Sequence, residues 1–73
     1  MPDMKQQIVS YVKQVDDVRG EIARHWSMIQ KSVSDGEVDA AISLLNAYFR
    51  LKLKLEVVEG QLAGLLGGYF SDK

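Results

Sequence analysis

The fold follows from the stretch MKQQIVSYVKQVDDVRGEIARHWSMIQKSV, residues 4–33. Its apolar residues recur in alternating steps of four and three, and this spacing places them on one side of an α-helix. The seam consists of Met4, Ile8, Tyr11, Val15, Val18, Ile22, His25 and Ile29. On one flank the seam is widened by Val12, Trp26 and Val33. The pattern predicts a helix over residues 3–33.

A polar break, Ser34-Asp35-Gly36-Glu37, interrupts the apolar pattern. A serine followed three residues later by a glutamate is typical of a capping box, in which each side chain bonds the other residue's backbone N–H. We therefore expect a turn at residues 34–36 that leads into a second helix over residues 37–66, capped by Ser34. A connection this short makes the two helices antiparallel.

The second stretch carries two apolar stripes. Its seam consists of Ala41, Leu44, Tyr48, Leu51, Leu55, Val58, Leu62, Leu65 and Tyr69. A second stripe runs beside it through Val38, Ile42, Leu45, Phe49 and Leu53. A helix that is apolar on two sides contacts more than one neighbour. The sequence therefore predicts an all-α protein: an antiparallel two-helix hairpin that dimerises into a four-helix bundle.

Two parts of the second stretch allow alternative interpretations. Residues 49–57, FRLKLKLEV, alternate between apolar and charged side chains, as in a half-buried strand. Their Leu, Lys, Arg and Glu content favours helix, although a strand paired with another copy stays open at this stage. Farther on, Gly60, Gly64 and Gly67 allow two interpretations. Either the first helix approaches closely here, or Tyr11 sits in a notch between small residues. Alternatively, the second helix frays toward a C-cap at residues 67–68 and ends in a tail over 67–73.

Size and composition point to a partner chain. A single domain over residues 1–73 is small enough to need a disulfide, a metal or a partner, and the sequence has no cysteine. The formal net charge of −1 gives no overall positive field for nucleic acid. The first residues lack the pattern of a signal peptide, and no run of 18 apolar residues occurs. We expect a cytoplasmic protein without a membrane segment.

No catalytic or cofactor motif stands out. The sole histidine, His25, is four residues from Glu21 and shares a helix face with it, but no glycine-rich elbow or second base accompanies the pair. Helical di-iron sites require Glu-x-x-His, whereas the spacing here is Glu21-x-x-x-His25, with Glu56 and Glu59 on the second stretch. We expect no enzyme activity, no cofactor and no metal, and interpret His25 as a packed residue satisfied by a neighbour.

Interaction with another protein is therefore the leading hypothesis. The sequence predicts a homodimeric interaction module of adaptor, co-chaperone or inhibitor type, in which Trp26, Tyr48 and Phe49 meet near the turn. Its expected partner-binding residues are Ile42, Leu45, Phe49, Leu53, Tyr69 and Phe70. The alternative is an RNA- or DNA-binding hairpin with a basic patch in the middle of the rod, formed by Lys13, Arg24, Arg50, Lys52 and Lys54.

Overall fold

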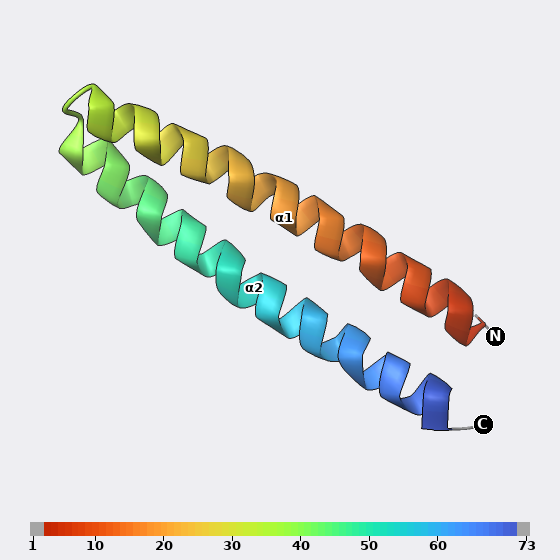
Figure 1. The fold of residues 1–73 in the computed structure, drawn as a ribbon. Coiled ribbons are helices and arrows are strands. Elements are labelled where there is room, and N and C mark those ends of the chain that lie inside the picture. The colour runs from red at the N-terminus through yellow and green to blue at the C-terminus, as the bar shows by residue number, and fades with distance from the viewer. Residues whose placement is uncertain (1–2, 72–73) are drawn as a thin grey trace.

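The computed structural model describes residues 3–71 and contains two helices, α1 (Met4–Ser34) and α2 (Val38–Ser71). They lie side by side and antiparallel, joined by a short turn at one end, with both termini at the other (Figure 1). The rod measures 55 × 17 × 14 Å between Cα extremes. The predicted all-α helical hairpin is confirmed.

The turn forms differently from the predicted capping box. Ser34 is the last residue of α1, and Asp35 caps that helix. Gly36 has a φ of +76°, and its N–H donates to the Val33 carbonyl at 3.1 Å. The N–H of Glu37 donates to the Ser32 carbonyl at 2.8 Å. This pair of bonds is the Schellman motif, which satisfies the last carbonyls of α1 and needs a residue that tolerates positive φ.

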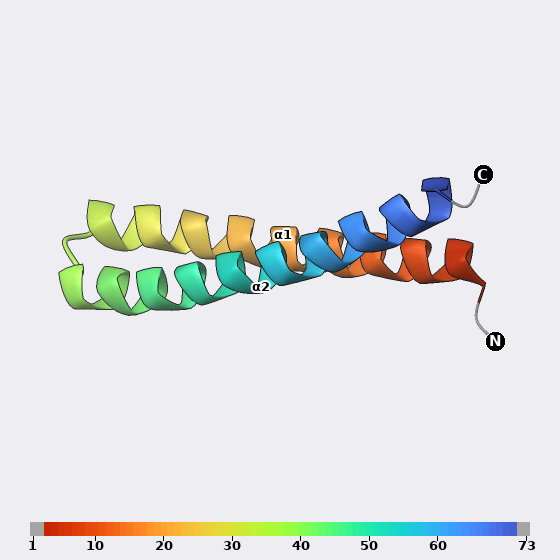
Figure 2. The same ribbon diagram turned by 90° about the horizontal axis from the view of Figure 1, so that it is seen from below.

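The two predicted seams face each other along the hairpin. Val15, Val18 and Ile29 of α1 are buried, as are Ala41 and Val58 of α2. The other predicted seam residues of both helices are half-buried. Figure 2 shows the helices crossing in projection, as expected when apolar residues repeat every seven positions and the helices wind round each other to keep them in contact.

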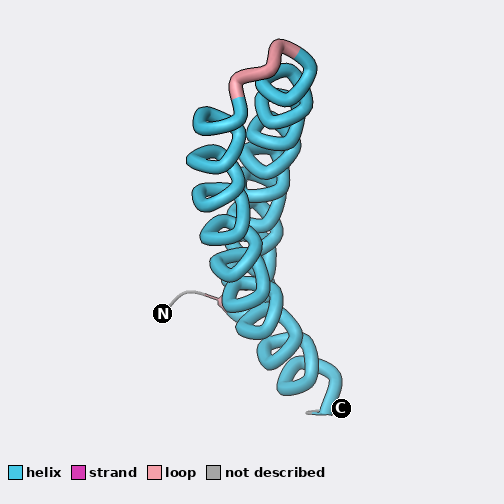
Figure 3. Tube along the Cα trace, turned by 90° about the vertical axis from the view of Figure 1, so that its left-hand side faces the viewer, coloured by secondary structure: helices cyan, strands magenta, loops and turns pink. Residues whose placement is uncertain are grey.

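Residues 49–57 are helical, and the tube view shows no strand in the described residues (Figure 3). The strand alternative is therefore wrong. Helix formers and a seam that continues through Leu51 and Leu55 outweigh the local alternation.

The predicted tail and both interpretations of the glycines are also wrong. Helix α2 continues through Gly67 and Gly68 to Ser71, because Tyr69 extends the seam by one more step and is half-buried. The Ser71 hydroxyl donates to the Gly67 carbonyl at 2.5 Å. A Cβ added at Gly60, Gly64, Gly67 or Gly68 would meet no atom within 4 Å, so no close helix approach or notch requires these glycines. Residues 72–73 of the predicted tail lie outside the described residues.

Candidate protein-interaction surface

One flank of the seam on each helix carries most of the exposed apolar side chains. On α1, positions seven residues apart hold Val12, Arg19, Trp26 and Val33; on α2, they hold Val38, Leu45, Lys52, Glu59 and Leu66. Such positions stay on one side of helices that wind round each other. The two flanks lie on the same side of the hairpin, because Arg19 Nη2 donates to Glu59 Oε2 across it at 3.0 Å.

The next row outward extends this surface. Val9, Ile42, Phe49 and Phe70 each lie three or four residues from an apolar flank residue, which makes them neighbours on the helix surface. We call the combined surface the apolar face: Val9, Val12, Trp26, Val33, Val38, Ile42, Leu45, Phe49, Leu66 and Phe70. All of these except Leu45 are exposed. The other exposed large apolar side chains within residues 3–71 are Met28, Leu53 and Val57, which lie outside these two rows.

An aromatic cluster lies on the apolar face in the half of the hairpin nearest the turn. The Trp26 and Tyr48 ring centroids are 5.4 Å apart, and Phe49 meets Tyr48 edge-on at 5.4 Å. The ammonium of Lys52 lies over the Tyr48 ring at 5.4 Å. Trp26 and Phe49 nevertheless remain 45% and 57% exposed. The predicted meeting of these three aromatic residues is confirmed, and it leaves large ring surfaces uncovered.

Charged side chains cross the apolar face near its middle, and Lys5 lies in the same row as Val12 at the end nearest the termini. The ion pair between Arg19 and Glu59 lies at the middle, with side-chain exposures of 60% and 42%. Lys52 and Glu56 lie beside it on α2, and Asp16 lies beside it on α1. We call the five central residues the charged belt. It divides the apolar face into a cluster near the turn and a smaller cluster near the termini.

The opposite side of the hairpin carries polar and charged side chains at its middle and toward the termini, whereas Met28 is exposed there nearer the turn. A hollow between the helices on this side is lined by Gln14, Asp17, Val18, Glu21, Lys54 and Val58. A second hollow, nearer the termini, is lined by Gln6, Gln7, Ser10, Tyr11, Gln14 and Leu65. The hairpin thus has two unlike faces, and its exposed apolar area is concentrated on one of them.

The structure does not gather the five predicted cations into one patch. Lys52 belongs to the charged belt, whereas Lys54 lines the polar hollow together with Asp17 and Glu21. Lys13 lies on the outer side of α1, at a depression that α1 alone lines. The remaining two cations, Arg24 and Arg50, are exposed and line neither hollow. Acidic neighbours and this spread both reduce the positive field that nucleic acid requires.

The predicted partner-binding residues divide between the apolar face and other positions. Ile42, Leu45 and Phe49 lie on the apolar face. Leu53 is 62% exposed and lies four residues after Phe49, one row farther out on α2. At the end of α2, Tyr69 belongs to the seam, and its ring meets Phe70 edge-on with centroids 5.2 Å apart.

The histidine takes part in a local hydrogen bond. His25 Nδ1 lies 2.9 Å from the backbone carbonyl of Glu21, an acceptor, so this nitrogen carries the donated proton. Glu21 thus contributes its main chain to His25, leaving its carboxylate out of the bond. Within residues 3–71, no group of three or more histidine, aspartate or glutamate side chains is arranged to hold a metal ion.

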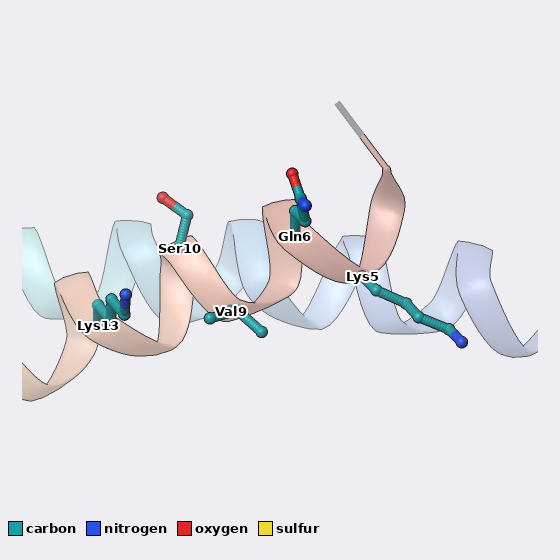
Figure 4. Close-up of a pocket in the computed structure, with 5 residues that line it drawn as sticks. All are labelled: Lys5, Gln6, Val9, Ser10 and Lys13. Carbon is teal, nitrogen blue, oxygen red and sulfur yellow. The ribbon is translucent and has the colours of Figure 1, made fainter. Parts of the chain in front are cut away.

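The depression on α1 lacks the convergent groups of a small-molecule site. Lys5, Gln6, Val9, Ser10 and Lys13 line it, and all five project from the same helix (Figure 4). Binding sites for small molecules are usually concave and walled by several elements. This depression instead forms the edge of the apolar face at Val9.

Neither helix, within the described residues, offers the long and weakly charged apolar window that crossing a bilayer requires. Comparison with protein-family models, with curated proteins and with solved structures found no match to this chain.

Proposed function

We propose that this chain is a non-enzymatic protein–protein interaction module of adaptor, co-chaperone or inhibitor type. Its helical hairpin acts by covering its apolar face with another protein surface. The observation that carries the proposal is the concentration of exposed apolar side chains on one face of a rod whose opposite face carries Asp17, Glu21 and Lys54 at its middle. Contiguous apolar surfaces of this kind mark interaction sites in soluble proteins.

The small core supports the proposal. Only five apolar residues within 3–71 are buried, and each of them keeps at least 2% of its surface exposed. Chains of this length rarely gain more than about 3–5 kcal/mol from a single core. Covering one further Val, Leu, Ile or Phe side chain completely contributes roughly 1.5–3 kcal/mol. A protein surface on the apolar face would therefore contribute as much to stability as the whole intramolecular core.

Equilibrium unfolding of the isolated chain tests this proposal. Urea unfolding is followed by far-ultraviolet circular dichroism over a series of protein concentrations that extends to the lowest measurable signal. We expect a free energy of unfolding below about 3 kcal/mol for the isolated monomer, because its core is small. A monomer with a free energy of unfolding of about 5 kcal/mol or more would need no partner surface and would contradict the proposal.

Nucleic-acid binding has weaker support. Of the five cations considered for it, Lys52 interacts with the Tyr48 ring, and Lys54 shares its hollow with Asp17 and Glu21. A rod with scattered cations and a net charge of −1 offers few adjacent contacts to successive phosphates.

A further inference from the structure

We propose that the surface covering the apolar face is a second copy of this chain, related by a two-fold axis, so that two hairpins form a four-helix bundle. This inference rests on the proposed function and specifies its partner. It assigns the interface to the apolar face, which holds Trp26, Ile42 and Phe49. It leaves Leu53 and Val57 outside the interface, although they are equally apolar and 62% and 61% exposed.

The lengthwise pattern of the apolar face is suited to its own copy. Arg19 lies at the midpoint of α1, and Lys52 and Glu56 lie close to the midpoint of α2, so the charged belt is central. A two-fold interface brings the same patch of both copies together. With a central belt, rotation about an axis along the rod or across it places belt on belt and apolar cluster on apolar cluster. An unrelated partner would need to reproduce this pattern independently.

The charges of the belt also suit self-association. It contains both signs: Arg19 and Lys52 are positive, and Asp16, Glu56 and Glu59 are negative. A belt of one sign would repel its copy, whereas this one offers each cation carboxylates on the opposing hairpin. Complementary charges of this kind fix the register of an interface.

The area is sufficient for a stable dimer. A face of 55 by 17 Å offers on the order of 900 Å², compared with about 800 Å² per partner in stable protein complexes. Its aromatic residues, Trp26 and Phe49, lie at the end of the turn-side cluster next to the charged belt, and so toward the middle of the whole face. Large aromatic residues in such positions dominate binding energy. Packing two antiparallel hairpins face to face also makes every neighbouring helix pair antiparallel, as in up-down four-helix bundles.

Matched substitutions on α2 test the assignment of the face. Ile42→Asp and Phe49→Asp change the apolar face, whereas Val57→Asp and Leu53→Asp make the same change at 61% and 62% exposed positions outside it. Both members of each pair introduce an aspartate into the same helix, so the added charge is the same. We expect the first two variants to raise the dimer dissociation constant by about a hundredfold or more, because each copy loses a contact. The latter two should leave it within a few-fold of the unsubstituted chain.

Light scattering over a dilution series gives the mass, and Trp26, the only tryptophan, reports on the interface of the unsubstituted chain. Emission that moves to shorter wavelength and resists iodide quenching on association would support the inference. It would be overturned by an unchanged Trp26 signal on dimer formation, or by dissociation in the Leu53 and Val57 variants but not in the Ile42 and Phe49 variants.

A monomeric chain would separate the two proposals. If it is weakly stable at every concentration, the second copy is the wrong partner, and the proposed function stands. If the monomer is strongly stable, both proposals fail.

Discussion

Replacing either of two glycines in the interior of α2, Gly60 or Gly64, with alanine should stabilise the hairpin. Both are exposed, and an added Cβ would meet no atom within 4 Å at either position. Glycine in a helix interior costs about 1 kcal/mol relative to alanine, mainly through backbone entropy. With no clash to subtract, we expect each substitution to raise the free energy of unfolding by about 1 kcal/mol and the pair to raise it by about 2 kcal/mol.

The turn supplies a matched control of opposite sign. Gly36 also has no atom within 4 Å of an added Cβ, but its φ of +76° is unfavourable for alanine. Gly36→Ala should therefore lower the free energy of unfolding by about 1–2 kcal/mol through backbone strain alone. The same side-chain change thus has opposite effects at positions that are equally open.

Thermal and urea unfolding at one fixed protein concentration measure these effects. For a domain of this size, 1 kcal/mol corresponds to a shift in Tm of roughly 4–8 °C. A loss of stability in Gly60→Ala would refute the reasoning, because the methyl group would then contact atoms that the hairpin itself does not supply. The outer side of α2 would be covered by a partner, in conflict with an interface on the apolar face. A gain in Gly36→Ala would contradict the left-handed turn.

Three further predictions follow from individual contacts. Arg19→Glu should weaken dimerisation, and combining it with Glu59→Arg should restore the affinity, because the double variant keeps opposite charges in the belt. Sedimentation equilibrium measures both dissociation constants. A double variant that dimerises no better than Arg19→Glu would count against pairing of the belts. His25→Leu should raise the free energy of unfolding, measured by thermal unfolding, by about 1 kcal/mol. Leucine increases apolar burial at the seam, and the Glu21 carbonyl keeps its helical hydrogen bond. A marked decrease in the free energy of unfolding would show that the imidazole has a further role. Fluorescence anisotropy with labelled RNA and DNA should show no tight binding at physiological salt. The nucleic-acid alternative would be established by binding whose affinity falls steeply with salt and is abolished by Arg50→Glu and Lys54→Glu.

The sequence predicted the seams well because burial imposes their period. Every predicted seam residue of α1 and α2 is buried or half-buried, including His25 and Tyr69. The turn mechanism was less predictable. The Ser34 and Glu37 spacing suits a capping box, but a glycine one residue after the cap of α1 favours a Schellman motif, and the two motifs compete for the same residues.

The outer surface was predicted only in part. A stripe built from steps of four residues, such as Leu45 to Phe49 to Leu53, drifts by about 40° at each step relative to the helix axis. The seam instead advances by seven residues in two turns, so Leu53 lies about 80° round the helix from Leu45, one row beyond Phe49. The Arg19–Glu59 contact joins residues 40 positions apart, and its formation depends on long side chains whose conformations a sequence pattern does not specify.

The single turn also gives the hairpin a direction of assembly. Because both helices leave from Gly36, contacts farther from it close longer loops: Trp26 and Tyr48 are 22 residues apart, and Arg19 and Glu59 are 40 apart. Each doubling of loop length adds only about 0.6 kcal/mol to the entropic cost of closing the loop. Contacts between α1 and α2 can therefore form one after another from the turn toward the termini. The aromatic cluster would then form early in folding, and amide hydrogen exchange should be slowest around it and fastest where Met4 and Tyr69 meet solvent. A chain assembled in this order presents the turn-side half of its apolar face before the rest of the rod has closed.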